Sequence, residues 1–174
     1  MSSAGESYAV SGDVPTLEGI RARLVGLADG TVDRESAGGW AWVWVAERDT
    51  EVTDLRVWRH LDTLSGADSR VDPDTYLYDR TDFEDWLRRL PPPGWFPAGP
   101  DSYRLLLDLA PAGSPERTVV TAFGAPDADG ASAVLDLLAE RLVSVGYDGD
   151  WEEPNMTGRR IEALIDAFGG LGEE

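Results

Sequence analysis

The chain has 174 residues, and 33 acidic residues against 15 basic ones give it a formal net charge of -18. Every basic residue is arginine, and the sequence contains no lysine, no cysteine and one histidine, His60. This composition excludes disulfide frameworks, thiolate metal sites, lysine Schiff-base chemistry and the P-loop lysine. A surface this acidic repels nucleic-acid phosphate, so the charge predicts no direct contact with DNA or RNA.

Residues 1–14 are small, polar and acidic, and we expect them to be a disordered lead-in without the features of a signal peptide. A helical module of residues 15–90 follows, because apolar residues recur there at helical spacing in four short runs. Residues suited to begin or end these helices flank the runs. They are Thr16, Gly30, Asp33, Asp54, Gly66 and the pair Thr81 and Glu84.

The run from residue 40 to residue 46 is ambiguous between helix and strand. Trp40, Trp42 and Trp44 alternate with smaller residues, which favours a strand, and the preceding Gly38-Gly39 pair weakens a helix by roughly 1 kcal/mol per glycine. Asp33 and a polar first turn favour a helix instead. We adopt the helix and keep the strand as the alternative.

Five prolines fall within residues 91–100, so residues 91–101 are predicted to be a proline-rich linker. Beyond it, residues 103–109 and 117–123 are predicted to form a β-hairpin, followed by two helices that begin near Asp127 and Thr157. Residues 102–170 would then be a ββαα module, either separate from the first module or packed with it as one domain. The predicted fold class is α+β, a short-helix bundle followed by a β-hairpin with two helices.

No catalytic residue, metal site or cofactor is predicted. His60 lies in the middle of a predicted helix with no orienting carboxylate on the same face, so we expect a surface or rim position for it. The acidic loop that starts at Asp148 fails the calcium-loop pattern, because Glu153 and Arg159 stand where glycine and glutamate are required.

Two acidic stretches stand out, since residues 62–85 and residues 127–153 hold eight acids each against two and one arginines. Such a stretch either is a solvated face that aids solubility or steers a basic partner onto the surface, where aromatic side chains would anchor it. The predicted partner-binding residues are Tyr76, Tyr78, Asp79, Asp148, Asp150, Trp151, Glu152 and Glu153.

Several short segments within residues 17–90 are similar to small bacterial immunity-type proteins found beside polymorphic toxins. The similarity lies in Thr31-Val32-Asp33-Arg34-Glu35, Trp40-Ala41, Val57-Trp58, Tyr76-Leu77-Tyr78 and Trp86-Leu87. The resemblance implies neutralisation of a toxin by direct binding, and it implies no catalytic residue.

These observations predict a non-enzymatic, cytoplasmic, immunity- or antitoxin-like protein that occludes the surface of a basic protein such as a toxin. It would contact neither nucleic acid nor membrane. Two alternatives stay open. One is a DNA mimic that inhibits a nucleic-acid-binding protein, and the other is a carboxylate-dependent, metal-assisted enzyme with paired acids in a pocket.

Overall fold

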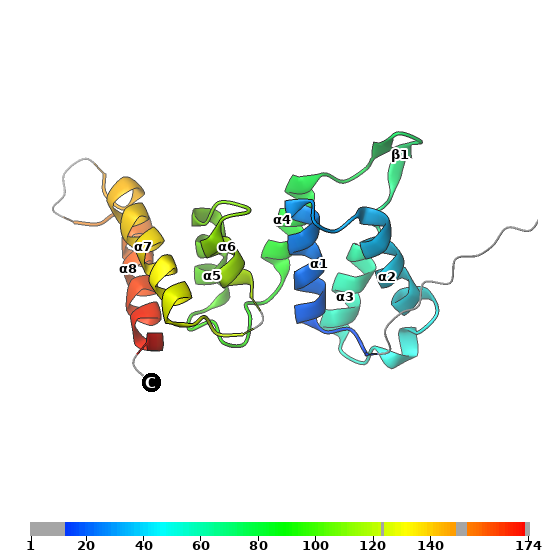
Figure 1. Ribbon diagram of the computed structural model, residues 1–174, viewed down its shortest axis with the longest axis horizontal. Helices are drawn as coiled ribbons and strands as arrows, with labels where there is room; N and C mark the ends of the chain where they lie inside the picture. The colour runs from blue at the N-terminus through cyan, green and yellow to red at the C-terminus, as the bar shows by residue number, and fades with distance from the viewer. Residues whose placement is uncertain (1–12, 123, 149–152, 173–174) are drawn as a thin grey trace, which may run out of the picture. The chain divides into compact units, whose positions relative to one another are not determined.

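The computed structural model describes residues 13–122, 124–148 and 153–172, and it divides into two compact units (Figure 1). Unit 1 ends at Leu90 and unit 2 begins at Pro91. The described chain is mostly helical with one small antiparallel sheet, so the predicted α+β class holds only in this coarse sense. Across the described ranges, no helix is both long and apolar enough to cross a membrane.

The described part of unit 1 contains four α-helices, a short 3-10 helix and a two-stranded sheet inserted before the last helix. Helix α1 packs against both α4 and α3, and α2 packs against α3, as the arrangement in Figure 1 shows. The elements are α1 (Leu17–Asp29), α2 (Arg34–Ala46), η1 (Asp49–Glu51), α3 (Leu55–Leu64), β1 (Arg70–Asp72), β2 (Thr75–Tyr76) and α4 (Arg80–Arg89).

The ambiguous tryptophan run is helical and belongs to α2. The Asp33 side chain accepts a hydrogen bond from the Ser36 amide at 2.7 Å, which begins the helix as the sequence predicted. Successive residues on a helix turn by 100°, so Trp40 and Trp44, four residues apart, share one face and Trp42 lies on the opposite side. Trp44 is fully buried, Trp40 is half-buried with the Arg23 guanidinium 3.5 Å from its ring centroid, and Trp42 is 57% exposed.

Helix α3 begins as predicted, because the Asp54 side chain accepts from the Arg56 amide at 2.8 Å. The predicted start of α4 at Thr81 is wrong by two residues. Asp79 caps that helix, and Asp82 closes the capping box by accepting from the Asp79 amide at 2.8 Å. In the capping-box pattern the residue three positions after the cap is glutamate or glutamine, and here Asp82 makes the same contact.

Unit 2 consists of helices α5 to α8 and a terminal 3-10 helix around its own apolar core. The proline-rich segment contributes to this core: Phe96 is buried, with its ring centroid 5.0 Å from that of Tyr103 and 5.8 Å from that of Phe168. The elements are α5 (Pro100–Leu109), α6 (Pro115–Thr121), α7 (Ala128–Val145), α8 (Met156–Gly169) and η2 (Gly170–Gly172).

The predicted β-hairpin of unit 2 is wrong, because both of its strands are helices. Pro100 and Pro115 occupy first-turn positions of α5 and α6, where a proline fixes a helical φ and its missing N–H costs nothing. Ser114 caps α6 by accepting from the Arg117 amide at 3.1 Å. In its described residues, the second module is therefore a set of four α-helices, not ββαα.

Helices α7 and α8 approach closely where the chain turns between them. A Cβ atom on Gly158 would lie 2.3 Å from the Gly146 carbonyl oxygen, so glycine is required at this contact. Asn155 caps α8 by accepting from the Gly158 amide at 2.9 Å, which corrects the predicted cap at Thr157. Asp127 caps α7 as expected, accepting from the Gly130 amide at 2.9 Å.

Candidate functional site

Tyr76, a predicted partner contact, is held within unit 1 by a polar network. Its hydroxyl donates to the Glu35 carboxylate and accepts from the Arg70 guanidinium at 2.6 Å, and Arg70 pairs with Glu35 at 2.7 Å. The guanidinium carbons of Arg34 and Arg70 lie 4.4 and 4.2 Å from the Tyr76 ring centroid. The hydrogen bond from Tyr76 lowers the pKa of Glu35 and raises the pKa of the Tyr76 hydroxyl.

Tyr78 and Asp79 also serve the fold of unit 1. The Tyr78 ring packs edge-on against Trp86 with centroids 4.8 Å apart, and its carbonyl accepts from the Arg34 guanidinium. The Asp79 carboxylate caps α4 by accepting from the Thr81 amide at 2.7 Å. The structure thus gives all three residues of this predicted group an intramolecular role.

The second predicted group lies in unit 2, and the structure describes only part of it. Asp148 accepts a hydrogen bond from the Asn155 side-chain amide at 2.7 Å, and exposed Glu153 pairs with Arg159 at 3.3 Å. Asp150, Trp151 and Glu152 lie outside the described residues. The prediction for this loop therefore stays a prediction.

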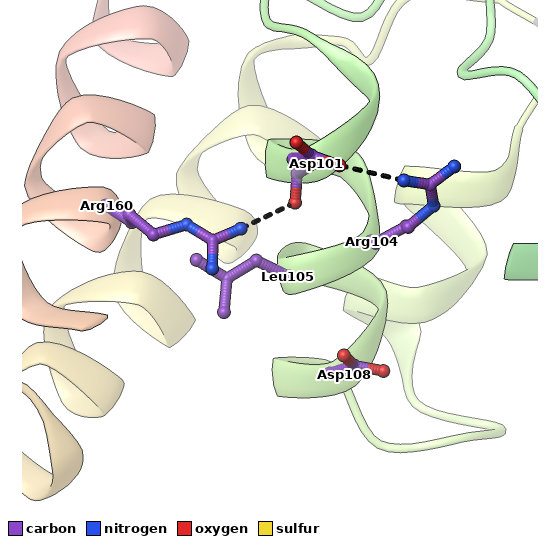
Figure 2. Close-up of a pocket in the computed structure, with 5 residues that line it drawn as sticks. All are labelled: Asp101, Arg104, Leu105, Asp108 and Arg160. Atoms are coloured by element: carbon purple, nitrogen blue, oxygen red, sulfur yellow. Dashed lines mark hydrogen bonds and ion pairs between the residues drawn. The ribbon is translucent and has the colours of Figure 1, made fainter. Parts of the chain in front are cut away.

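A pocket in unit 2 brings acids and arginines together (Figure 2). Asp101 and Arg104 of α5 pair at 2.8 Å, and Arg160 of α8 donates to the Asp101 carbonyl at 2.9 Å. Asp108 and Leu105 complete the wall. Of the two contacts drawn in Figure 2, the Asp101–Arg104 pair lies within α5, and the bond from Arg160 to the Asp101 carbonyl joins α8 to α5.

The enzyme alternative requires acids in a pocket whose pKa values are raised towards neutrality. The shifts resolved for described carboxyls go the other way. Hydrogen bonds from Tyr76, Arg48 and Arg56 lower the pKa of Glu35, Glu51 and Asp54, the last to about 2, and all three carboxyls lie at the surface. Among the described residues, no group of three or more metal-ligating side chains comes together either.

Helix α3 carries more arginines than acidic residues, whereas the two are balanced in the other described α-helices of unit 1. Arg56, Arg59 and Thr63 are exposed and lie at spacings of three and four residues, so they share one face of the helix. Arg56 pairs with Asp54 at 2.8 Å. Within the described residues, the Arg59 guanidinium has no hydrogen-bond or ion-pair partner, and it is free to bind an external anion.

His60 lies on the flank of α3 and is half-buried. Burial lowers the pKa of His60 from 6.5, and the nearby charge of Arg21 lowers it further. Protonation is therefore harder in the folded protein than in the unfolded chain. The contribution of neutral His60 to the stability of unit 1 is complete above pH 6.5. It is lost as the pH falls from there towards the lowered pKa of His60 in the folded protein.

We expect the melting temperature of unit 1 to fall between pH 7 and pH 5, and the His60→Gln variant to lose most of this dependence. Thermal unfolding followed by circular dichroism at the two pH values measures it. The His60→Gln variant is the control for other groups, since His60 alone ordinarily titrates in this interval. An equal fall in both proteins would show that the effect does not come from His60.

The described part of unit 1 is thus a helical domain with an arginine-bearing helix on its surface. A family model described as "YxzC DNA-binding protein" matches residues 2–90, and the chain belongs to this family. The "Uncharacterized protein YxzC" of Bacillus subtilis (strain 168) is 36% identical over 67 residues. That alignment covers 38% of this chain and 55% of the relative, so the chain spans about half the length of its curated relative. No solved structure matches.

The family overturns the identification as a toxin-associated immunity or antitoxin-like protein, because nothing in these matches points to toxins. Helix-forming segments with buried tryptophans occur in many helical domains, so the resemblance had little power to discriminate. The prediction of a basic protein partner without direct nucleic-acid contact is also wrong, since the family is described as DNA-binding. That prediction used the total charge, whereas binding depends on the local charge of the contacting surface.

Arg56, Arg59 and Thr63 were not among the site residues predicted from the sequence, for the same reason. Their signal was present in the sequence, because the helix predicted between Asp54 and Gly66 places them on the face away from Trp58, Leu61 and Leu64. What the sequence did not show is which arginines lie beside a carboxylate in the folded domain. Arg70, for example, meets Glu35 across 35 residues of chain.

Proposed function

We propose that unit 1 binds DNA through the outer face of α3. Support for DNA as the ligand comes from the family, whose model covers residues 2–90 and so coincides with this unit. Support for α3 comes from its charge, which is the observation that carries the proposal. With Arg56 and Arg59 against Asp62, α3 has a formal charge of +1 when His60 is neutral, and every other described α-helix is neutral or negative.

The side chains on this face have the chemistry that DNA contacts require. A guanidinium binds phosphate or the O6 and N7 acceptors of guanine through paired N–H donors. The Thr63 hydroxyl donates to the Arg59 carbonyl at 3.1 Å, so its oxygen is left as an acceptor for a base amine. Arg59 offers its donors without first breaking an ion pair. Arg56 could exchange Asp54 for a phosphate at little cost, because an exposed ion pair contributes only about 0–1 kcal/mol.

The net charge of unit 1 as a whole opposes this binding electrostatically. Residues 1–90 contain 18 acids and 10 arginines, a balance of -8. Long-range attraction to DNA is therefore absent, and affinity must come from a few close contacts. With two phosphate contacts, the logarithm of the association constant should fall with the logarithm of salt concentration with a slope of about -1.8.

The Arg59→Ala variant should bind a short duplex about tenfold more weakly than the unchanged protein, because one charge-assisted contact is lost. Fluorescence anisotropy with a labelled duplex at low ionic strength measures the affinity and, by salt titration, the slope. Arg89→Ala is the matched control, since Arg89 is an exposed arginine of the same unit with no described ion pair. Equal losses for the two variants, or a duplex that does not bind at all, would refute α3 as the contact.

A further inference from the structure

The structure contains a second feature of unit 1 that suits nucleic acid, a hollow beside Trp42. Of the tryptophans in the described residues, Trp42 alone has more than half of its surface in solvent. The hollow has a volume of about 340 Å³ and is lined by Gly38, Gly39, Trp42, Ser65 and Asp68. We call it the Trp42 hollow.

The two glycines create the space next to the indole. A long side chain on a helix leans back towards the residues three and four positions earlier, which for Trp42 are Gly39 and Gly38. A Cβ atom on Gly39 would meet nothing within 4 Å. Neither glycine contributes a side chain to the hollow, so no side chain at these two positions covers the exposed Trp42 indole that lines it.

The polar side of the hollow accepts hydrogen bonds. The Asp68 carboxylate lies over Gly38, where a Cβ atom would approach its Oδ1 to 2.9 Å, and no described residue donates a side-chain hydrogen bond or pairs with it. The Ser65 hydroxyl donates to the Asp62 carbonyl at 2.7 Å, so its hydrogen is committed and its oxygen is left as an acceptor. A ligand edge that fits must carry N–H donors.

We propose that the Trp42 hollow binds an unpaired nucleobase of single-stranded DNA that carries an exocyclic amine. This rests on the proposed function, since it takes DNA as the ligand of unit 1. The base would stack on the Trp42 indole, as every base has a π-face, and donate its amine to Asp68. Duplex bases cannot enter, because their faces are stacked and their Watson–Crick edges are paired.

The hollow distinguishes between bases by their donors. Cytosine presents its N4 amine to a carboxylate, and guanine and adenine also carry exocyclic amines. Thymine has no amine, and its one ring N–H is flanked by two carbonyl oxygens that a carboxylate repels. Oligo(dC) and oligo(dT) are the matched probes, because both are pyrimidine strands and differ at the edge that Asp68 would read.

The test measures binding of short labelled oligo(dC) and oligo(dT) by anisotropy with the full chain. We expect oligo(dC) to bind about fivefold more tightly than oligo(dT). We also expect Trp42→Ala to weaken the binding of oligo(dC) about tenfold, and Trp42→Phe to restore most of the loss.

Asp68→Asn should abolish the preference for oligo(dC) over oligo(dT), because an amide both donates and accepts. Gly39→Leu should block the hollow without a clash. Leu77→Ala, at a residue 52% exposed in the same unit, is the control and should change nothing.

Duplex binding separates this inference from the proposed function. If duplex binds and depends on Arg59, while oligo(dC) and oligo(dT) bind equally and Trp42→Ala has no effect, the Trp42 hollow is not a base site and the α3 proposal stands. If oligo(dC) is preferred and Trp42 and Asp68 are required, the inference holds whatever Arg59 contributes. Absence of binding to all three probes would overturn both.

Discussion

Replacing Trp44 by alanine is expected to destabilise unit 1 by about 3–5 kcal/mol. Trp44 is fully buried in the core of unit 1, where it packs among α1, α2 and α3 residues such as Ile20, Ala41 and Leu61. Alanine would leave a cavity the size of an indole, and the Arg48 guanidinium, 3.9 Å from the ring centroid, would lose its platform. A small domain is typically stable by only about 5–15 kcal/mol, so this loss brings unit 1 close to unfolding.

The Trp44→Phe variant separates the volume of the side chain from its polar atom. The Trp44 indole N–H is buried without a hydrogen-bond partner among the described residues, which is itself unfavourable. Phenylalanine removes this N–H and keeps most of the ring, so its cost should be clearly smaller than that of alanine. Urea unfolding followed by tryptophan fluorescence and near-UV circular dichroism compares the variants. An alanine variant as stable as the unchanged protein would contradict the assignment of Trp44 to the core.

The helices of unit 1 could be predicted because their signals are local. Asp33 and Asp54 each cap a helix within two or three residues, and apolar residues recur along each helix with the period of one face. The same kind of local signal, the cap at Asp33, also favoured the helix over the strand at residues 40–46. A strand would have placed the three tryptophans on one face, whereas the helix separates exposed Trp42 from buried Trp44.

Unit 2 could not be predicted as well, because two signals conflict at its start. Val119 and Val120 favour a strand, and the run of three leucines in α5 has no visible period. The deciding information is the proline at the start of each helix together with burial at spacings of three and four residues, as for Tyr103, Leu106 and Leu107. Helix packing against α7 outweighs the intrinsic preference of the valines for a strand.

The candidate site was missed because it depends on which charges meet in the folded chain. The acidic stretch of residues 62–85 looked like a contact surface, yet its aromatic residues are used in intramolecular contacts such as the Tyr76 hydroxyl with Glu35. That pair is 41 residues apart in sequence. Arg59 lies on the described α-helix with a net positive charge and has no described carboxylate partner, and only the folded domain reveals that second fact.

Replacing Phe168 by alanine is expected to destabilise unit 2 by about 3–5 kcal/mol and to leave duplex binding by unit 1 unchanged. Phe168 is fully buried near the end of α8. Its ring makes edge-on contacts with Trp95 and Phe96, with centroids 6.2 and 5.8 Å away, so it fastens the proline-rich segment to the helices. Phe168→Leu keeps apolar volume and should cost less than about 1.5 kcal/mol.

Comparison of Phe168→Ala with Trp44→Ala tests whether the two units unfold separately. Each variant should lower the unfolding transition of its own unit, and only Trp44→Ala should abolish duplex binding, because α3 belongs to the unit it damages. Calorimetry resolves the two transitions, and anisotropy reports the binding. If Phe168→Ala also removed duplex binding, residues beyond the family match would be needed for the function, and α3 alone would not suffice.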